Sequence, residues 1–119
     1  MTVIAVFAST EYESLKAMLV DSKIFKANNI IQICKDSLKK AERETLFLVH
    51  WKEYQGVIND IISIKKDTTA LIVYAPQHEG RIEDPEILTK INSQRNSIIV
   101  NFRGRLLNDI IVSLITTSL

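Results

Sequence analysis

The sequence predicts a three-layer α/β fold, because short β-branched runs alternate with helical segments along most of the chain. The runs are apolar throughout instead of alternating with polar residues, which is typical of parallel strands covered on both faces. Right-handed crossovers between such strands produce a doubly wound parallel sheet. The chain has 119 residues, which is enough for one hydrophobic core, and we expect residues 1–119 to form a single domain.

Each clear strand pattern is followed by a helical pattern. Ser9 and Thr10 are expected to cap the first helix, where Thr10 and Glu13 fit a capping box. Asp84 is the expected N-cap of a helix that begins at Pro85 and runs to about Gln94. The last helix is expected from Arg105 to about Ser118. Clear strands are expected at residues 2–8, 45–50, 68–75 and 97–101, where β-branched and large apolar residues dominate.

Residues 21–44 admit two interpretations. Three isoleucines among residues 30–33 follow Asn28 and Asn29, which favours a short buried strand. This strand would be the fifth and would give a flavodoxin-like sheet in the order 2-1-3-4-5. The alternative is four strands with a long helix at residues 22–43, because the apolar residues there also follow a helical period.

Composition excludes several classes of protein. The net charge is +1, so nothing in the overall charge indicates binding to nucleic acid or to an anionic membrane. No run approaches the roughly 20 apolar residues of a membrane span, and no secretory leader is apparent. The single cysteine, Cys34, is expected to be a small buried residue in a reducing cytoplasm. We expect no metal site, because one cysteine and two histidines fall short of four close-spaced ligands, and we expect no cofactor.

Motifs known on folds of this kind are missing. With three glycines, at positions 56, 80 and 104, neither a dinucleotide-binding nor a P-loop motif can exist. A phosphorelay receiver needs an acidic pair after its first strand, an aspartate ending its third and a lysine after its last. The corresponding positions read Ser9-Thr10-Glu11, His50-Trp51 and Phe102-Arg103, so the phosphoacceptor is absent.

Polar residues gather where the expected strands end. In a parallel sheet the carboxyl ends of the strands share one edge, and ligands bind there. Free N–H groups at a helix start and cationic side chains suit a phosphate or a carboxylate. The simpler interpretation is helix capping together with surface ion pairs, for example between Arg103 and Glu11. The predicted ligand-binding set is Ser9, Thr10, His50, His78, Arg103 and Arg105.

The last helix carries little charge. From Leu106 onward its only charged side chain is Asp109, and its outward face is small and polar. Such a face suits contact with another helix, so we expect a homodimer through this surface. An ordinary last helix with a broad buried stripe explains the pattern equally well. The predicted interface residues are Asp109, Val112, Ser113 and Thr116.

The sequence therefore favours a non-catalytic, cytoplasmic regulatory domain that binds a small anion and acts as a homodimer. One alternative is a small enzyme, hydrolase-like or nucleotide-processing, that uses His50 or His78 as acid and base with Glu79 or Glu11. No nucleophile motif supports that alternative. The other is a protein-interaction module in which only the last helix matters.

Overall fold

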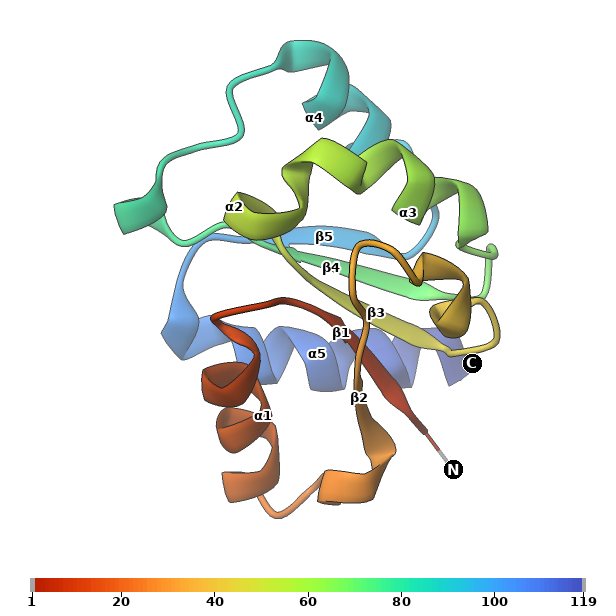
Figure 1. Ribbon diagram of the computed structural model, residues 1–119, viewed down its shortest axis with the longest axis vertical. Coiled ribbons are helices and arrows are strands. Elements are labelled where there is room, and N and C mark those ends of the chain that lie inside the picture. The colour runs from red at the N-terminus through yellow and green to blue at the C-terminus, as the bar shows by residue number, and fades with distance from the viewer. Residues whose placement is uncertain (1, 119) are drawn as a thin grey trace.

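The computed structural model describes residues 2–118 and contains a five-stranded, all-parallel sheet, drawn in Figure 1. The strand order is β2-β1-β3-β4-β5, which confirms the flavodoxin-like α/β fold that the sequence predicts. The register pairs Ile4 with Leu46 and Leu46 with Ala70, so the three central strands are aligned along their length. The strands are β1 (Ile4–Phe7), β2 (Ile30–Gln32), β3 (Leu46–His50), β4 (Ala70–Tyr74) and β5 (Ser97–Val100).

The uncertain segment forms a strand. β2 pairs with β1, with Ile30 opposite Ile4 and Gln32 opposite Val6. Short 3₁₀ turns at Ala27–Asn29 and Leu38–Ala41 precede and follow it, so a helix at 22–43 does not occur. The consecutive isoleucines, which lose side-chain freedom in a helix, pack instead on both faces of an edge strand.

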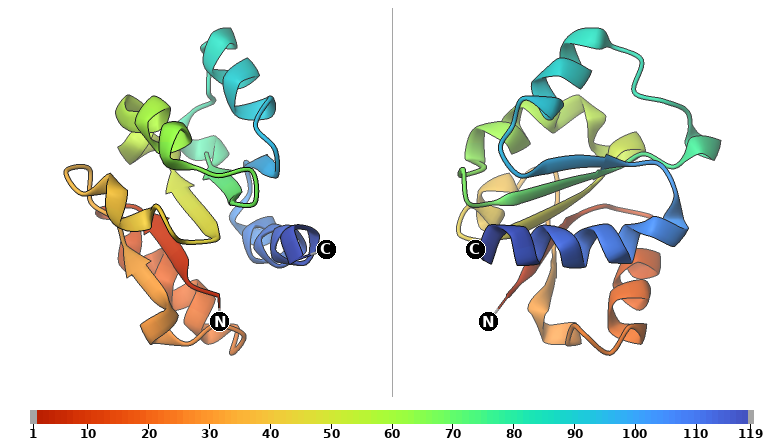
Figure 2. Two further views of the ribbon diagram at one scale, coloured as in Figure 1. Left: turned by 90° about the vertical axis from the view of Figure 1, so that its right-hand side faces the viewer. Right: turned by 180° about the vertical axis from the view of Figure 1, so that it is seen from behind.

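The helices lie in two layers, one on each face of the sheet (Figure 2). α1 (Tyr12–Asp21) and α5 (Arg103–Ser118) cover one face. α2 (Trp51–Tyr54), α3 (Ile58–Ile64) and α4 (Pro85–Asn92) cover the other.

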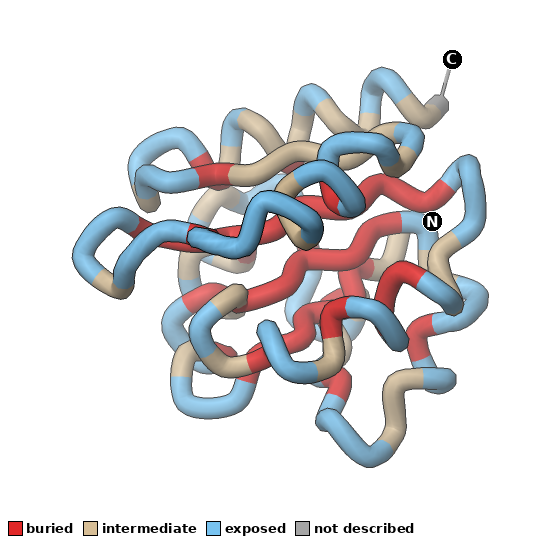
Figure 3. The backbone as a smooth tube through the Cα atoms, turned by 90° about the horizontal axis from the view of Figure 1, so that it is seen from above, coloured by how far each residue is buried: buried red, intermediate tan, exposed pale blue. Residues whose placement is uncertain are grey.

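Successive residues of each central strand point to opposite layers. Ile4 and Val6 belong to the core beneath α1 and α5, whereas Ala5 and Phe7 belong to the core on the other face. All four side chains are fully buried. Figure 3 shows the consequence, because the strands run as a buried centre surrounded by exposed loops and helix surfaces.

Some local expectations are corrected. The helix expected after β3 is interrupted by a 3₁₀ turn, Gln55–Val57, that contains Gly56, a residue that weakens a helix interior. α5 begins at Arg103 and not at Arg105. Asp84 caps α4 as predicted, and its Oδ1 accepts a 2.9 Å hydrogen bond from the Glu86 N–H.

The environment expected for Cys34 is wrong. Cys34 is exposed, because the buried part of this segment ends at Ile33, whose N–H donates to the Val6 carbonyl. The chain then turns away from the sheet into the loop before the second 3₁₀ turn. Among residues 2–118, no helix is long and apolar enough to cross a membrane.

Candidate functional site

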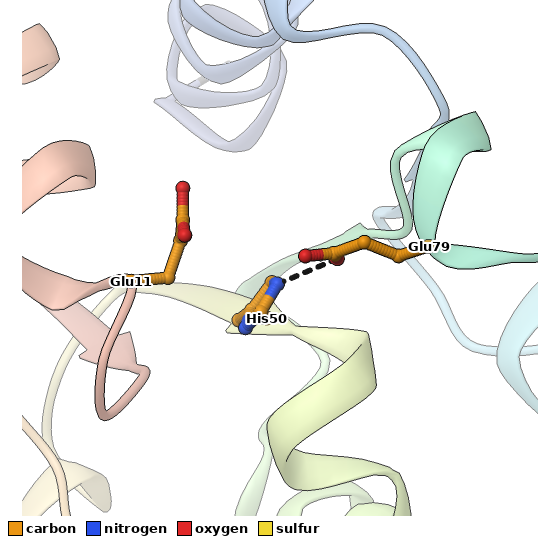
Figure 4. Close-up of side chains that lie close together, drawn as sticks. All are labelled: Glu11, His50 and Glu79. Atoms are coloured by element: carbon orange, nitrogen blue, oxygen red, sulfur yellow. Dashed lines mark hydrogen bonds and ion pairs between the residues drawn. The ribbon is translucent and has the colours of Figure 1, made fainter.

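The carboxyl ends of β1, β3 and β4 bring acidic side chains around one buried histidine (Figure 4). His50 is the last residue of β3 and is 2% exposed. Glu11 comes from the start of α1, and Glu79 from the turn Gln77–Glu79 that follows β4. Gly80 ends that turn with φ of 98°, a conformation that residues with side chains rarely adopt.

The N-terminus of α1 is capped by Glu53, a residue of α2. The Glu53 Oε1 accepts from the Ser9 N–H at 2.9 Å and from the Glu11 N–H at 3.3 Å. Its Oε2 accepts from the Thr10 N–H at 2.7 Å and from the Thr10 hydroxyl at 2.8 Å. The amide groups that would attract an anion therefore already hold a carboxylate of the same chain.

The expected capping box is consequently wrong. α1 begins after Glu11, which makes no side-chain capping bond, and the Thr10 hydroxyl donates to Glu53 instead of accepting from the helix. A carboxylate with two oxygens satisfies more of the free N–H groups than one hydroxyl can.

These contacts control the charge of Glu53. Burial raises the pKa of its carboxyl group, but hydrogen bonds from Ser9, Thr10 and His50 outweigh that effect. Together they lower the pKa from its ordinary value of 4.5 to about 2. Glu53 is therefore a fixed negative charge at neutral pH.

Both ring nitrogens of His50 face carboxylates. Nδ1 lies 2.8 Å from the Glu53 Oε1, and Nε2 lies 2.7 Å from the Glu79 Oε1. Only a doubly protonated ring can donate to both oxygens at once. Neither Ser9 nor Thr10 hydrogen-bonds to the ring within residues 2–118, so the nucleophile–histidine pair of a hydrolase is not formed there.

Arg103, the first residue of α5, lies beside Glu11 at the same edge of the sheet. Its Nη1 lies 3.2 Å from the Glu11 Oε1, which is the ion pair that the simpler interpretation expects. Its Nη2 donates to the Ser14 carbonyl at 2.9 Å and to the Ser14 hydroxyl at 2.6 Å. The guanidinium also lies 5.7 Å from the centre of the Tyr74 ring, within range of a cation–π contact.

A shallow recess of about 270 Å³ lies beside this group, between the ends of β4 and β5. His78 and Arg103 both line it, although the His78 side chain is 79% exposed and makes only a 4.0 Å contact with Glu79. Phe102, which is 49% exposed, forms part of the same wall. The remaining lining residues are Tyr74, Pro76, Gln77 and Asn101.

The predicted ligand-binding residues thus fall into three groups. Ser9, Thr10 and His50 are brought together around Glu53. His78 and Arg103 line the recess. The Arg105 side chain is exposed on α5 and joins neither group among residues 2–118.

Glu53 is the functional residue that the sequence interpretation misses. Its signal is present in the sequence, since it follows His50 by three residues and so lies within one helical turn of the strand end. The sequence does not reveal that the fold brings Glu53 into contact with Ser9, which lies 44 positions earlier in the chain.

Fold and site together define a flavodoxin-like α/β domain with a histidine–carboxylate cluster at the carboxyl edge of its sheet. Comparison of the chain with protein-family models, with curated proteins and with solved structures found no match.

Proposed function

We propose that this protein is a non-catalytic regulatory domain that binds a small anion in the recess between β4 and β5 and acts as a homodimer. The observation that carries the proposal is the shared location of His78 and Arg103 in one recess. One of these side chains comes from the turn after β4 and the other from the start of α5, and two such polar side chains lining one recess are typical of sites that hold small anions.

The size of the recess favours a small ligand. Its volume of about 270 Å³ lies just below the roughly 300–1,000 Å³ of pockets that hold drug-sized molecules. Inorganic phosphate, a sugar phosphate or a short dicarboxylate suits such a space better than a dinucleotide. The half-exposed Phe102 offers an apolar surface to the uncharged part of the ligand.

The Glu11–Arg103 pair does not prevent binding. The two side chains are 33% and 36% exposed, and ion pairs this open contribute only about 0–1 kcal/mol. A phosphate, which carries more charge than one carboxylate and offers a bidentate edge, competes well for the guanidinium.

The helix start at Ser9 and Thr10 is a poorer anion site, because Glu53 already accepts from both N–H groups. An anion entering there would meet the negative charge of Glu53. The proposed ligand-binding residues are therefore His78 and Arg103, and Gln77 and Asn101 line the same recess.

Thermal denaturation tests ligand binding. We expect phosphate or a sugar phosphate to raise the melting temperature of the wild-type protein in EDTA-containing buffer. Arg103→Ala should abolish the increase, whereas Arg95→Ala, which removes an exposed arginine before β5, should retain it. A panel of phosphates and dicarboxylates that leaves the melting temperature unchanged would contradict the proposal.

The homodimer rests on the outer face of α5. Val112 and Ile115 are 50% and 59% exposed there, and Asp109 is the only charge from Leu106 onward. A twofold dimer places the same surface on both copies, so a face with few charges avoids like-charge repulsion. Ser113 and Thr116 lie with Val112 around a small hollow beside β5.

Light scattering tests the dimer. The wild-type protein should have the mass of two chains, and Val112→Glu or Asp109→Lys should reduce it to one. Ile24→Glu is the matched control, because Ile24 is 58% exposed but lies outside α5. A monomeric wild-type protein, or a dimer that survives Val112→Glu, would exclude this surface.

A further inference from the structure

The buried imidazole of His50 is held between two carboxylates, Glu53 at Nδ1 and Glu79 at Nε2. The Glu53 carboxylate lies 2.8 Å from Nδ1, and it is itself fixed by hydrogen bonds from the N–H groups of Ser9 and Thr10. This leaves Nε2 directed at Glu79 and toward the side on which Glu11 lies. Histidines that bind metals have the same arrangement, in which one ring nitrogen donates to a carboxylate and the other faces the ion.

The contact between Nε2 and Glu79 brings two potential metal ligands together. When Nδ1 carries the ring proton, Nε2 and the Glu79 Oε1 are both acceptors, yet they lie 2.7 Å apart. A proton shared between the two groups accounts for this separation, and a metal ion would take its place after both atoms move slightly apart. Glu11, Glu53 and Glu79 contribute three carboxylates to this edge, and Arg103 pairs with Glu11.

The distances suit a metal ion. One ligand atom each from Glu11, His50 and Glu79 lies within 4.8 Å of the other two. Ligands about 2.1 Å from an ion are spaced about 3–4 Å from one another, so small side-chain rotations bring all three into contact with it. Figure 4 shows which side chain must rotate, because Glu79 points at the ring whereas the Glu11 carboxylate points away from it.

We propose that Glu11, His50 and Glu79 bind a divalent transition-metal ion, with Glu53 orienting the histidine. The ion replaces the proton between His50 and Glu79, and Glu11 exchanges Arg103 for the metal. One nitrogen and two carboxylate ligands fit ions from Mn²⁺ to Zn²⁺ better than Ca²⁺, which takes oxygen ligands. This proposal stands apart from the anion recess and does not depend on it.

Calorimetric titration of the whole, EDTA-stripped protein with ZnCl₂, MnCl₂ and CaCl₂ tests the site. We expect one Zn²⁺ per chain, weaker binding of Mn²⁺ in keeping with the order of ion affinities, and no saturable binding of Ca²⁺. Glu79→Gln should weaken Zn²⁺ binding at least about tenfold. Glu83→Gln makes the same charge change at an exposed position in the following loop and should leave binding unchanged.

Glu11→Gln and Glu13→Gln form a second matched pair, because both residues lie at the start of α1 and Glu13 is exposed outside the cluster. Only Glu11→Gln should weaken binding. His78→Gln tests for attachment to the exposed histidine, and we expect no effect.

Nitrogen NMR of the histidine rings gives a readout that needs no variant. Zn²⁺ should shift Nε2 of His50 and leave both ring nitrogens of His78 in place. The proposal is overturned if Zn²⁺ does not bind, if Glu79→Gln and Glu83→Gln bind it equally, or if the metal shifts His78 instead. In those cases the cluster is a structural hydrogen-bond network that holds no metal ion.

Discussion

The Glu53 Oε1 accepts a hydrogen bond from the Ser9 N–H at 2.9 Å, although the two residues are 44 positions apart. The same carboxylate contacts Thr10 and His50. One side chain therefore connects the start of α1, the end of β3 and the buried histidine. It also fills the place where the fold would otherwise attract an anion.

Removal of the Glu53 carboxylate should destabilise the protein. Glu53→Ala leaves the N–H groups of Ser9 and Thr10 without their acceptor and deprives His50 of its Nδ1 partner. Loss of a helix cap destabilises by about 0.5–2 kcal/mol, and the unpaired histidine adds to this. We expect a decrease of about 2–3 kcal/mol in the free energy of unfolding, measured with urea. Glu13→Ala, an exposed change in the first turn of α1, should stay within about 0.5 kcal/mol.

Small carboxylates should partly rescue Glu53→Ala. The substitution vacates a site lined by the N–H groups of Ser9 and Thr10 and the Thr10 hydroxyl. Formate is small enough to occupy it and carries the missing charge. We expect formate to raise the melting temperature of Glu53→Ala more than that of the wild type, with chloride at equal ionic strength as the control. Equal increases in both proteins would mean that the helix start does not attract an anion.

The free energy of unfolding should decrease at acidic pH because Glu53 becomes protonated. Its pKa is lowered from 4.5 to about 2 in the folded state, so the folded protein binds this proton more weakly than the unfolded chain does. The resulting stabilisation is fully present above pH 4.5 and is lost as the pH falls toward 2.

Urea denaturation between pH 2 and 5 in the presence of EDTA measures the effect. We expect the wild type to lose about 1–2 kcal/mol more than Glu53→Gln, once solvent screening is allowed for. The glutamine has no proton to bind, so it removes this contribution without shortening the side chain. Parallel curves for the two proteins would show that Glu53 is not held as a low-pKa carboxylate.

The fold was predictable because its signals are local. Continuous apolar runs such as Leu46–His50 identify buried parallel strands, and right-handed connections limit the possible strand orders, of which 2-1-3-4-5 is the most economical for five strands. Even β2 is recognisable from its isoleucines, despite a competing helical period. Asp84 and Pro85 mark their helix correctly for the same reason, since an N-cap acts over two or three residues.

The site was predictable only in part, because its main contacts join distant segments. The strand-end rule brings His50, Glu79 and Arg103 to one edge of the sheet. It does not indicate that Glu53 replaces Thr10 as the cap, or that Arg103 turns toward Ser14. Cys34 shows the same limit, because its exposure depends on where the chain leaves the sheet, one residue after Ile33.

A phosphate titration followed by amide NMR tests the central claim most directly. With EDTA present to exclude metal, inorganic phosphate should shift the amides of Gln77, His78 and Asn101 and the side chain of Arg103, which share the recess. The amides of Ser9 and Thr10 should stay in place, because Glu53 accepts from both. Saturable shifts confined to the recess are the predicted result. Shifts centred on Ser9 and Thr10, or none at all, would contradict an anion site between β4 and β5.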